Sequence, residues 1–145
     1  MIHRAHFILY VEDQDASRAF YAAVLGQSPS LHVPGMTEFR LSEDAVLGLM
    51  PGAGIRRLLG ERLPDPSAAA GIPRAELYLY VEEPALYHAR ALACGARELS
   101  APQLRDWGDL AGYSLDRDGH VLAFAARVPD AAVEEVLQNG ATLLP

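Results

Sequence analysis

The feature that most constrains the fold of this chain is an internal repeat with a spacing of 70 residues. Residues 6–13 read HFILYVED, and the similar stretch ELYLYVEE stands at 76–83. Both segments have the aromatic and β-branched composition of a strand, and both end in an acidic pair. Such self-similarity is typical of one supersecondary unit that is built twice.

A helix is predicted after each of these two strands. Residues 15–26 have apolar side chains at helical spacing and close on Gly26, a common helix stop. The second stretch, from Pro84 to Cys94, is followed by Gly95, and a proline is tolerated in the first helical turn. Both modules therefore open as a strand followed by a helix.

The second halves of the modules also match. Residues 39–49 align with residues 113–124 when Gly119 is treated as one inserted residue. The pair Asp118-Gly119 predicts a tight turn between two strands. The second strands are expected at 31–33 and 97–100. Each module is then βαβββ, which places the chain in the α+β class.

We expect one domain over 1–145, with the following parts: module one at 4–50, a linker at 51–73, module two at 74–127 and a C-terminal helix at 129–139. The linker is rich in Gly, Pro and Ala, and residues 55–62 are predicted to form one or two helical turns in it. Asp130 is the expected N-cap of the last helix.

Composition excludes several classes of protein. The formal net charge is −7 without a basic cluster, which argues against non-specific binding of nucleic acid. No apolar run approaches the roughly 20 residues of a membrane-spanning helix, and the N-terminal residues lack the features of a signal peptide, so a cytoplasmic protein is expected. Cys94 is the only cysteine, which excludes an internal disulfide and a cysteine zinc cluster, and it is expected to be a buried, inert thiol.

Three segments carry a resemblance to a known family: residues 7–11, Phe20-Tyr21 with 24–26, and DRDGHVL at 116–122. Over residues 4 to about 127 the chain resembles the vicinal oxygen chelate superfamily, which includes glyoxalase I, extradiol dioxygenases and the bleomycin resistance proteins. The resemblance implies a curved mixed sheet around a concave cavity and a homodimer. It leaves the function open, because one fold hosts isomerases, dioxygenases, transferases and plain binding proteins.

In the metal-dependent members, four ligands come from the first and fourth strands of the two modules. The resemblance places His6, Gly48, Glu76 and Ala123 at these positions, and only His6 and Glu76 have a side chain that binds metal. A catalytic metal site normally has at least three protein ligands. We therefore expect no metal cofactor. His6 and Glu76 remain the candidate metal ligands if a metal binds, the candidate catalytic bases, or a hydrogen-bonded pair.

Side chains alternate along a strand, so an inward His6 fixes the facing of its neighbours. The predicted ligand-binding residues are His6, Ile8, Tyr10, Gly48, Met50, Glu76, Tyr78, Tyr80, Trp107 and Ala123. The residues predicted to face the helices are Phe7, Leu9, Val11, Leu47, Leu49, Leu122 and Phe124.

Small side chains at Gly48 and Ala123 are expected to leave room for an organic ligand, and the tyrosines offer aromatic faces for planar or cationic groups. The resemblance is closest to the bleomycin-resistance-like members, and the leading hypothesis is a binding protein of that type, which binds a small aromatic or cationic molecule without a metal. The alternatives are a glyoxalase-like lyase or dioxygenase with a divalent metal at an incomplete site, and metal-free catalysis by His6 or Glu76.

Overall fold

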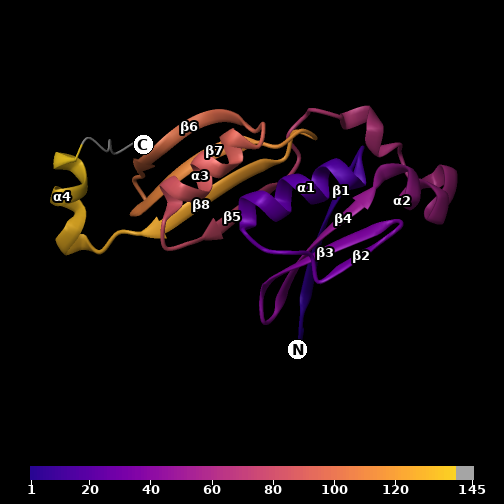
Figure 1. Ribbon diagram of the computed structural model, residues 1–145, viewed down its shortest axis with the longest axis horizontal. Coiled ribbons are helices and arrows are strands. Elements are labelled where there is room, and N and C mark those ends of the chain that lie inside the picture. Colours follow the sequence, from indigo (N-terminus) through magenta and orange to yellow (C-terminus); the bar gives the residue numbers. More distant parts are fainter. Residues whose placement is uncertain (140–145) are drawn as a thin grey trace. The chain divides into compact units, whose positions relative to one another are not determined.

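The computed structural model describes residues 1–139 and divides the chain into two compact units, Met1–Ala70 and the part from Gly71 onward. The first unit contains β1 (Ala5–Val11), α1 (Gln14–Leu25), β2 (Leu31–Val33), β3 (Met36–Ser42), β4 (Ala45–Pro51) and α2 (Gly52–Leu59), followed by short 3-10 helices at Gly60–Arg62 and Pro66–Ala69 (Figure 1). The second contains β5 (Glu76–Tyr80), α3 (Pro84–Ala93), β6 (Arg97–Leu104), β7 (Asp109–Leu115), β8 (Val121–Arg127), a 3-10 helix at Asp130–Ala132 and α4 (Val133–Gln138).

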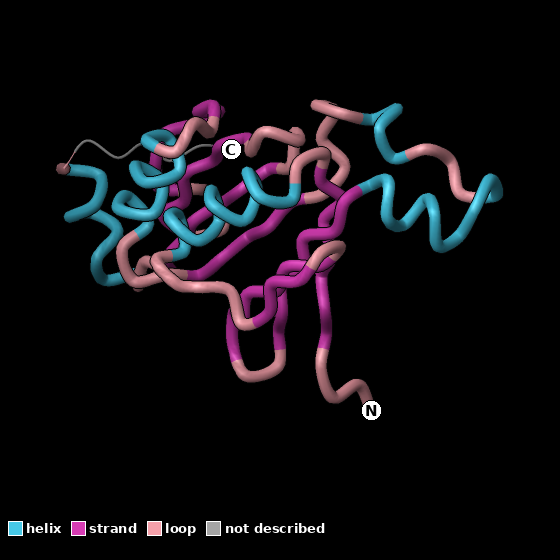
Figure 2. The backbone as a smooth tube through the Cα atoms, turned by 45° about the vertical axis from the view of Figure 1, so that its right-hand side comes forward, coloured by secondary structure: helices cyan, strands magenta, loops and turns pink. Residues whose placement is uncertain are grey.

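Both units have the same sheet topology. The strand order is β1-β4-β3-β2 in the first unit and β5-β8-β7-β6 in the second, and each sheet combines one parallel pair with antiparallel pairs. Each unit thus has one four-stranded mixed sheet accompanied by helices (Figure 2). The predicted α+β class and the tandem βαβββ modules are confirmed.

The ends of the first long helix follow from local chemistry. The side chain of Asp13 accepts a hydrogen bond from the backbone N–H of Ala16 and caps the start of α1. Gly26 ends the helix with a φ of 68°, a left-handed conformation that favours glycine. In the second unit, α3 begins at Pro84 and ends at Ala93.

Cys94 is exposed, which corrects the prediction of a buried thiol. It stands one residue past the end of α3, where its side chain is no longer held on the buried side of the helix. The prediction that Asp130 is an N-cap is also wrong. Asp130 is the first residue of the 3-10 helix, and Pro129 occupies the N-cap position. α4 itself begins only at Val133. The linker helix α2 begins three residues earlier than the predicted turn at 55.

The cores of the units follow the predicted alternation, with one exception. Leu9, Val11, Leu47 and Leu49 are buried in the first unit, and Leu122 and Phe124 in the second. Phe7 is instead 57% exposed. α1 packs mainly on β4 and β3, so the start of the edge strand β1 receives little cover from that helix.

The strand register corrects the alignment of the third strands. Phe39 pairs with Leu47 on β4, whereas Tyr113 pairs with Ala123 on β8. Phe39 therefore lies in the core layer, and Tyr113 lies on the opposite face of its sheet. The cause is a register irregularity between Arg40 and Ser42, since a shift of one residue moves side chains to the other face.

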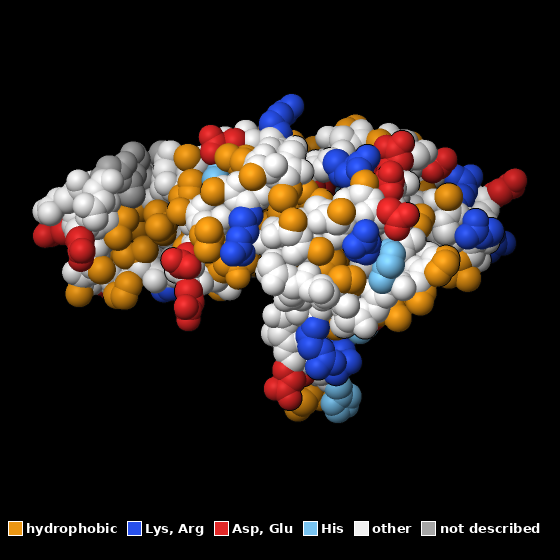
Figure 3. All heavy atoms as spheres, viewed as in Figure 1, with side chains coloured by type: hydrophobic (Ala, Val, Ile, Leu, Met, Phe, Trp, Pro, Cys, Tyr) orange, Lys and Arg blue, Asp and Glu red, His pale blue; other side chains and the backbone are white. Residues whose placement is uncertain are grey.

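Among the described residues, no helix is both long and apolar enough to cross a membrane. Basic side chains are scattered among acidic ones on the face drawn in Figure 3, in agreement with the absence of a basic cluster from the sequence.

Gly119 is predicted to be irreplaceable in the β7–β8 turn. Its φ is +88°, and a Cβ there would lie 2.5 Å from the carbonyl carbon of Gly71. Gly95 also has a positive φ, but a Cβ there would meet nothing within 4 Å. Gly119→Ala should therefore lower the free energy of unfolding by at least about 1 kcal/mol more than Gly95→Ala, for which backbone strain alone costs about 1 kcal/mol. Urea titration measures both, and equal losses would contradict this reading.

Candidate functional site

The candidate site lies on the face of the second sheet that is opposite α3. Phe124 marks the α3 side, because its ring lies 5.3 Å from that of Tyr87 on α3. Alternation then puts Ala123, Ala125 and Arg127 on the other side. We call this side the tyrosine face; its residues are Glu76, Tyr78 and Tyr80 of β5, Val121, Ala123, Ala125 and Arg127 of β8, and Asp109, Ala111 and Tyr113 of β7.

The centre of the tyrosine face is a buried carboxylate. Asp109 is fully buried, and its Oδ2 accepts hydrogen bonds of 2.7 Å from both Tyr78 Oη and Tyr80 Oη. The indole Nε1 of Trp107 donates to Tyr78 Oη at 3.0 Å. Arg127 donates to the carbonyl oxygen of Trp107, and its Nη1 lies 3.6 Å from Asp109 Oδ1. We call these five residues the Asp109 cluster.

The hydrogen bonds shift the protonation equilibria of the Asp109 cluster. Burial by itself raises the pKa of Asp109, but the two tyrosine hydrogen bonds and the charge of Arg127 outweigh it and hold that pKa below its ordinary value. Burial, assisted by the carboxylate, raises the pKa of Tyr78. The hydrogen bond to Asp109 is the main cause that raises the pKa of Tyr80. At neutral pH the site therefore presents one carboxylate and two neutral phenols.

Aromatic rings gather over a floor of small side chains. The rings of Tyr78 and Tyr80 are 5.5 Å apart, and those of Tyr78 and Tyr113 are 6.4 Å apart, all at steep angles. Ala123 stands between Tyr78 and Tyr113 in the strand register and is fully buried. Tyr80 is 66% exposed and Trp107 46%, so two aromatic side chains of the cluster are open to contact.

Arg105 anchors the edge of the tyrosine face that is formed by β7 and the neighbouring strand β6. Its buried guanidinium donates to the carbonyl oxygens of Ala111 and Ala101 and to Ser100 Oγ. The guanidinium carbon lies 5.1 Å from the centre of the Tyr113 ring, a cation–π distance. Burial, together with the charge of Glu76, raises the pKa of Tyr113. Arg105 thus fixes the irregular part of β6 between Ser100 and Gln103 and packs against the ring of Tyr113.

The first unit places its predicted residues on the face of the sheet opposite its core. His6 pairs in register with Val46, Ile8 with Gly48, and Tyr10 with Met50. These pairs bring the predicted residues of β1 and β4 side by side. Leu9 and Val11, which alternate with them, are buried in the core layer.

The charged partner of His6 inside its own unit is Glu38, with 3.2 Å between Nδ1 and Oε2. Sequence reasoning missed Glu38, although alternation along β3 would have placed it on the same side as Gly48.

Part of the space directly beside Gly48 is taken by neighbouring side chains, and the expected room for a ligand at this position stays a prediction. A Cβ at this position would lie 3.0 Å from Ile8 Cγ1 and 3.3 Å from Met36 Sδ. These two flexible apolar side chains fill the volume that a larger residue at position 48 would take. The surroundings of Gly48 in the first unit are thus aliphatic, in contrast to the tyrosine rings around Ala123 in the second.

The residues at the four family positions do not fit a metal site. Gly48 and Ala123 offer no donor atom, so each unit supplies one ligand at most from these positions, His6 or Glu76. Ile8 and Met36 surround the Gly48 position with apolar atoms and one thioether sulfur, which are poor ligands for hard divalent ions. These residues therefore support no reaction step through a metal.

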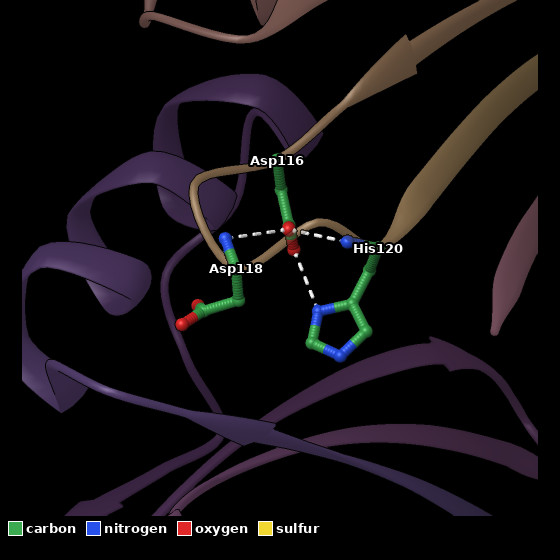
Figure 4. A group of neighbouring side chains, drawn as sticks. All are labelled: Asp116, Asp118 and His120. Carbon is green, nitrogen blue, oxygen red and sulfur yellow. Dashed lines mark hydrogen bonds and ion pairs between the residues drawn. The ribbon is translucent and has the colours of Figure 1, made fainter. Parts of the chain in front are cut away.

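A second group of possible metal ligands lies at the β7–β8 turn. Asp116, Asp118 and His120 each have a ligand atom within 4.8 Å of the others (Figure 4). Asp116 Oδ1, however, accepts from the backbone N–H groups of Asp118 and His120, and its Oδ2 lies 3.1 Å from His120 Nδ1. These bonds organise the predicted hairpin, and we interpret the group as a turn motif.

Residues 6–125 match the family described as "Glyoxalase-like domain". The chain belongs to this family. The glyoxalase-like chain is therefore a member of the vicinal oxygen chelate superfamily, as its sequence resemblance indicated. Among curated proteins none matches it.

Solved structures share its fold. A glyoxalase-related enzyme from Fulvimarina pelagi is 24% identical, with a TM-score of 0.72 over 85% of this chain and 86% of that one. A glyoxalase/bleomycin resistance protein/dioxygenase family enzyme from Burkholderia phytofirmans PsJN is 21% identical, with a TM-score of 0.72 over 85% and 97%. A glyoxalase/bleomycin resistance protein/dioxygenase from Nocardioides is 21% identical, with a TM-score of 0.70 over 87% and 83%.

The role of Asp109 can be tested by titrating the tyrosines. In Asp109→Asn, the pKa of Tyr80 should fall toward its ordinary value, whereas the pKa of Tyr78 should stay raised because burial is its main cause. A raised folded-state pKa stabilises the protein below about pH 10, and this contribution is lost as the pH rises through the folded-state pKa. NMR of 13C-labelled tyrosine rings measures both groups. Tyr10→Phe is the control, and an unchanged Tyr80 in Asp109→Asn would refute the assignment.

Proposed function

We propose that this glyoxalase-like protein binds a small aromatic organic molecule on the tyrosine face without a metal. The observation that carries the proposal is the Asp109 cluster, in which a buried carboxylate orients two phenols and one of these phenols accepts from an indole. Aromatic ligands are stabilised by offset or edge contacts with such rings. The fold of the family is compatible with this role, since its relatives include bleomycin resistance proteins by name.

The polar atoms of the cluster support a ligand that carries hydrogen-bond donors. Tyr80 and Tyr78 both donate their hydroxyl hydrogens to Asp109. Tyr78 Oη also accepts from the Trp107 indole, whereas the lone pairs of the exposed Tyr80 Oη are left to accept from a ligand. Bonding to a carboxylate also makes a phenol oxygen a better acceptor, because hydrogen bonds in a chain polarise one another. An aromatic ring that bears N–H groups matches both the rings and these acceptors.

The metal-dependent lyase or dioxygenase is the weaker candidate. The donor set at the four family positions is incomplete, and the side chains beside Gly48 are apolar. His6 and Glu76 stay candidate bases for a metal-free reaction, and His6 already has a carboxylate partner in Glu38. A homodimer and a cytoplasmic location stay predictions, and an elution profile of the purified protein tests the first of them.

The proposal predicts binding of neutral aromatic amides in the presence of a chelator. Trp107 is the only tryptophan, so quenching of intrinsic fluorescence by benzamide or 1-naphthamide reports on this site alone. Tyr80→Ala should weaken binding about tenfold, which corresponds to about 1.4 kcal/mol of lost ring contact. Isothermal titration measures the affinity independently of the indole.

Phe7→Ala is the matched control, because Phe7 is an exposed ring of the first unit. Its affinity for the amides should equal that of the unchanged protein. Binding that requires an added divalent metal, or that Tyr80→Ala leaves unaltered, would overturn the proposal.

A further inference from the structure

One oxygen of the buried carboxylate lacks a hydrogen bond. Asp109 Oδ2 is saturated by the two phenols, whereas Oδ1 is buried and accepts no hydrogen bond from the described residues. A buried acceptor left in this state costs about 1–3 kcal/mol, and the cost is larger for a charged group. One more hydrogen-bond donor at Oδ1 would therefore stabilise the site.

The guanidinium of Arg127 lies close to Asp109 Oδ1 but is too far from it to donate a hydrogen bond. Its Nη1 is 3.6 Å from Oδ1, beyond hydrogen-bond range, while the Arg127 side chain is 64% exposed. The same nitrogen donates to the carbonyl oxygen of Trp107. The guanidinium also lies over Gly108, where a Cβ would stand 2.8 Å from it. Arg127 thus forms an ion pair with the carboxylate but no hydrogen bond to Oδ1.

We propose that Arg127 is an internal stand-in for a cationic ligand, and that the tyrosine face binds planar amidinium or guanidinium compounds which displace it from Asp109. This inference rests on the proposed function and names its ligand class. A small planar cation can donate one N–H to Asp109 Oδ1 and a second to Tyr80 Oη, whose hydroxyl bonds to the other carboxylate oxygen. The ring attached to the cation then lies against Tyr80 and Trp107.

The charges of the site favour a cation over an anion. The carboxylate is fully buried and already ionised, so a ligand anion placed beside it would be repelled at short range. Arg127 has a wide exposed surface, and its side chain can swing into solvent at little cost. Displacing an exposed arginine from a 3.6 Å contact exchanges a weak ion pair for a charge-assisted hydrogen bond. The formal net charge of −7 also attracts cations to the chain.

The test compares benzamidinium, which is a planar cation, with benzamide, its neutral counterpart of nearly the same shape. Removal of the competing guanidinium in Arg127→Ala should strengthen benzamidinium binding at least about fivefold and leave benzamide binding unchanged. Arg127→Lys keeps the charge and should bind benzamidinium nearly as the unchanged protein does. Asp109→Asn should lose the preference for the cation. Isothermal titration at low salt gives each affinity.

Arg97→Ala is the matched control, because it removes one exposed positive charge from the same unit. A similar gain in Arg97→Ala would show a general charge effect and overturn the inference. So would weaker binding of both probes in Arg127→Ala, which would make Arg127 a ligand contact, or absence of benzamidinium binding to that variant. If benzamide binds through Tyr80 while benzamidinium gains nothing, the proposed function stands and only the stand-in role of Arg127 fails.

Discussion

Each sheet of this protein has its long helix, α1 or α3, on one face only, and the arrangement of the remaining side chains follows from this constraint. The helix side is closed by aliphatic and aromatic packing of the ordinary kind. The opposite side is built from the sheet's own residues. In the first unit, Ile8 and Met36 close over Gly48. In the second, rings and hydrogen bonds are arranged around one carboxylate.

The carboxylate of Asp109 determines what the second face presents. A charge removed from water is stable only when other groups compensate it. Here two phenols donate hydrogen bonds to the carboxylate, and the guanidinium of Arg127 forms an ion pair with it. The same bonds fix the positions of the two tyrosine hydroxyl groups and so restrict rotation of each side chain about its Cα–Cβ bond. A stabilising requirement of the fold thereby yields an ordered aromatic surface.

Local signals in the sequence were sufficient for the fold. The repeat, the glycine at each helix end and the Asp118-Gly119 turn act over a few residues, and they predicted the α+β modules. The alternation of β5 likewise predicted that Tyr78 and Tyr80 share a face. Tyr78, Tyr80 and Trp107 are thus the members of the Asp109 cluster that could be predicted from the sequence.

The missed features depend on packing between distant segments. Phe7 is exposed because α1 lies over β3 and β4, a preference that no single strand encodes. Asp109 and Arg127 stand opposite each other only through the β7–β8 register. Glu38 reaches His6 across β4. Asp109 directly follows Asp106-Trp107-Gly108 in the sequence. An acidic residue beside such a turn is usually exposed to solvent, so no sequence pattern indicated that Asp109 is buried.

Phe39 and Tyr113 align in the sequence but lie on opposite faces of their sheets, and this difference bears on how duplicated modules diverge in evolution. Two strands of similar composition present opposite sets of side chains, because the irregularity near Ser42 shifts one register by a residue. Insertion or loss of one residue in a hairpin can therefore turn a buried aromatic row outward without any substitution in the strand. Turn length, as much as strand composition, then becomes a source of new binding surfaces in duplicated modules.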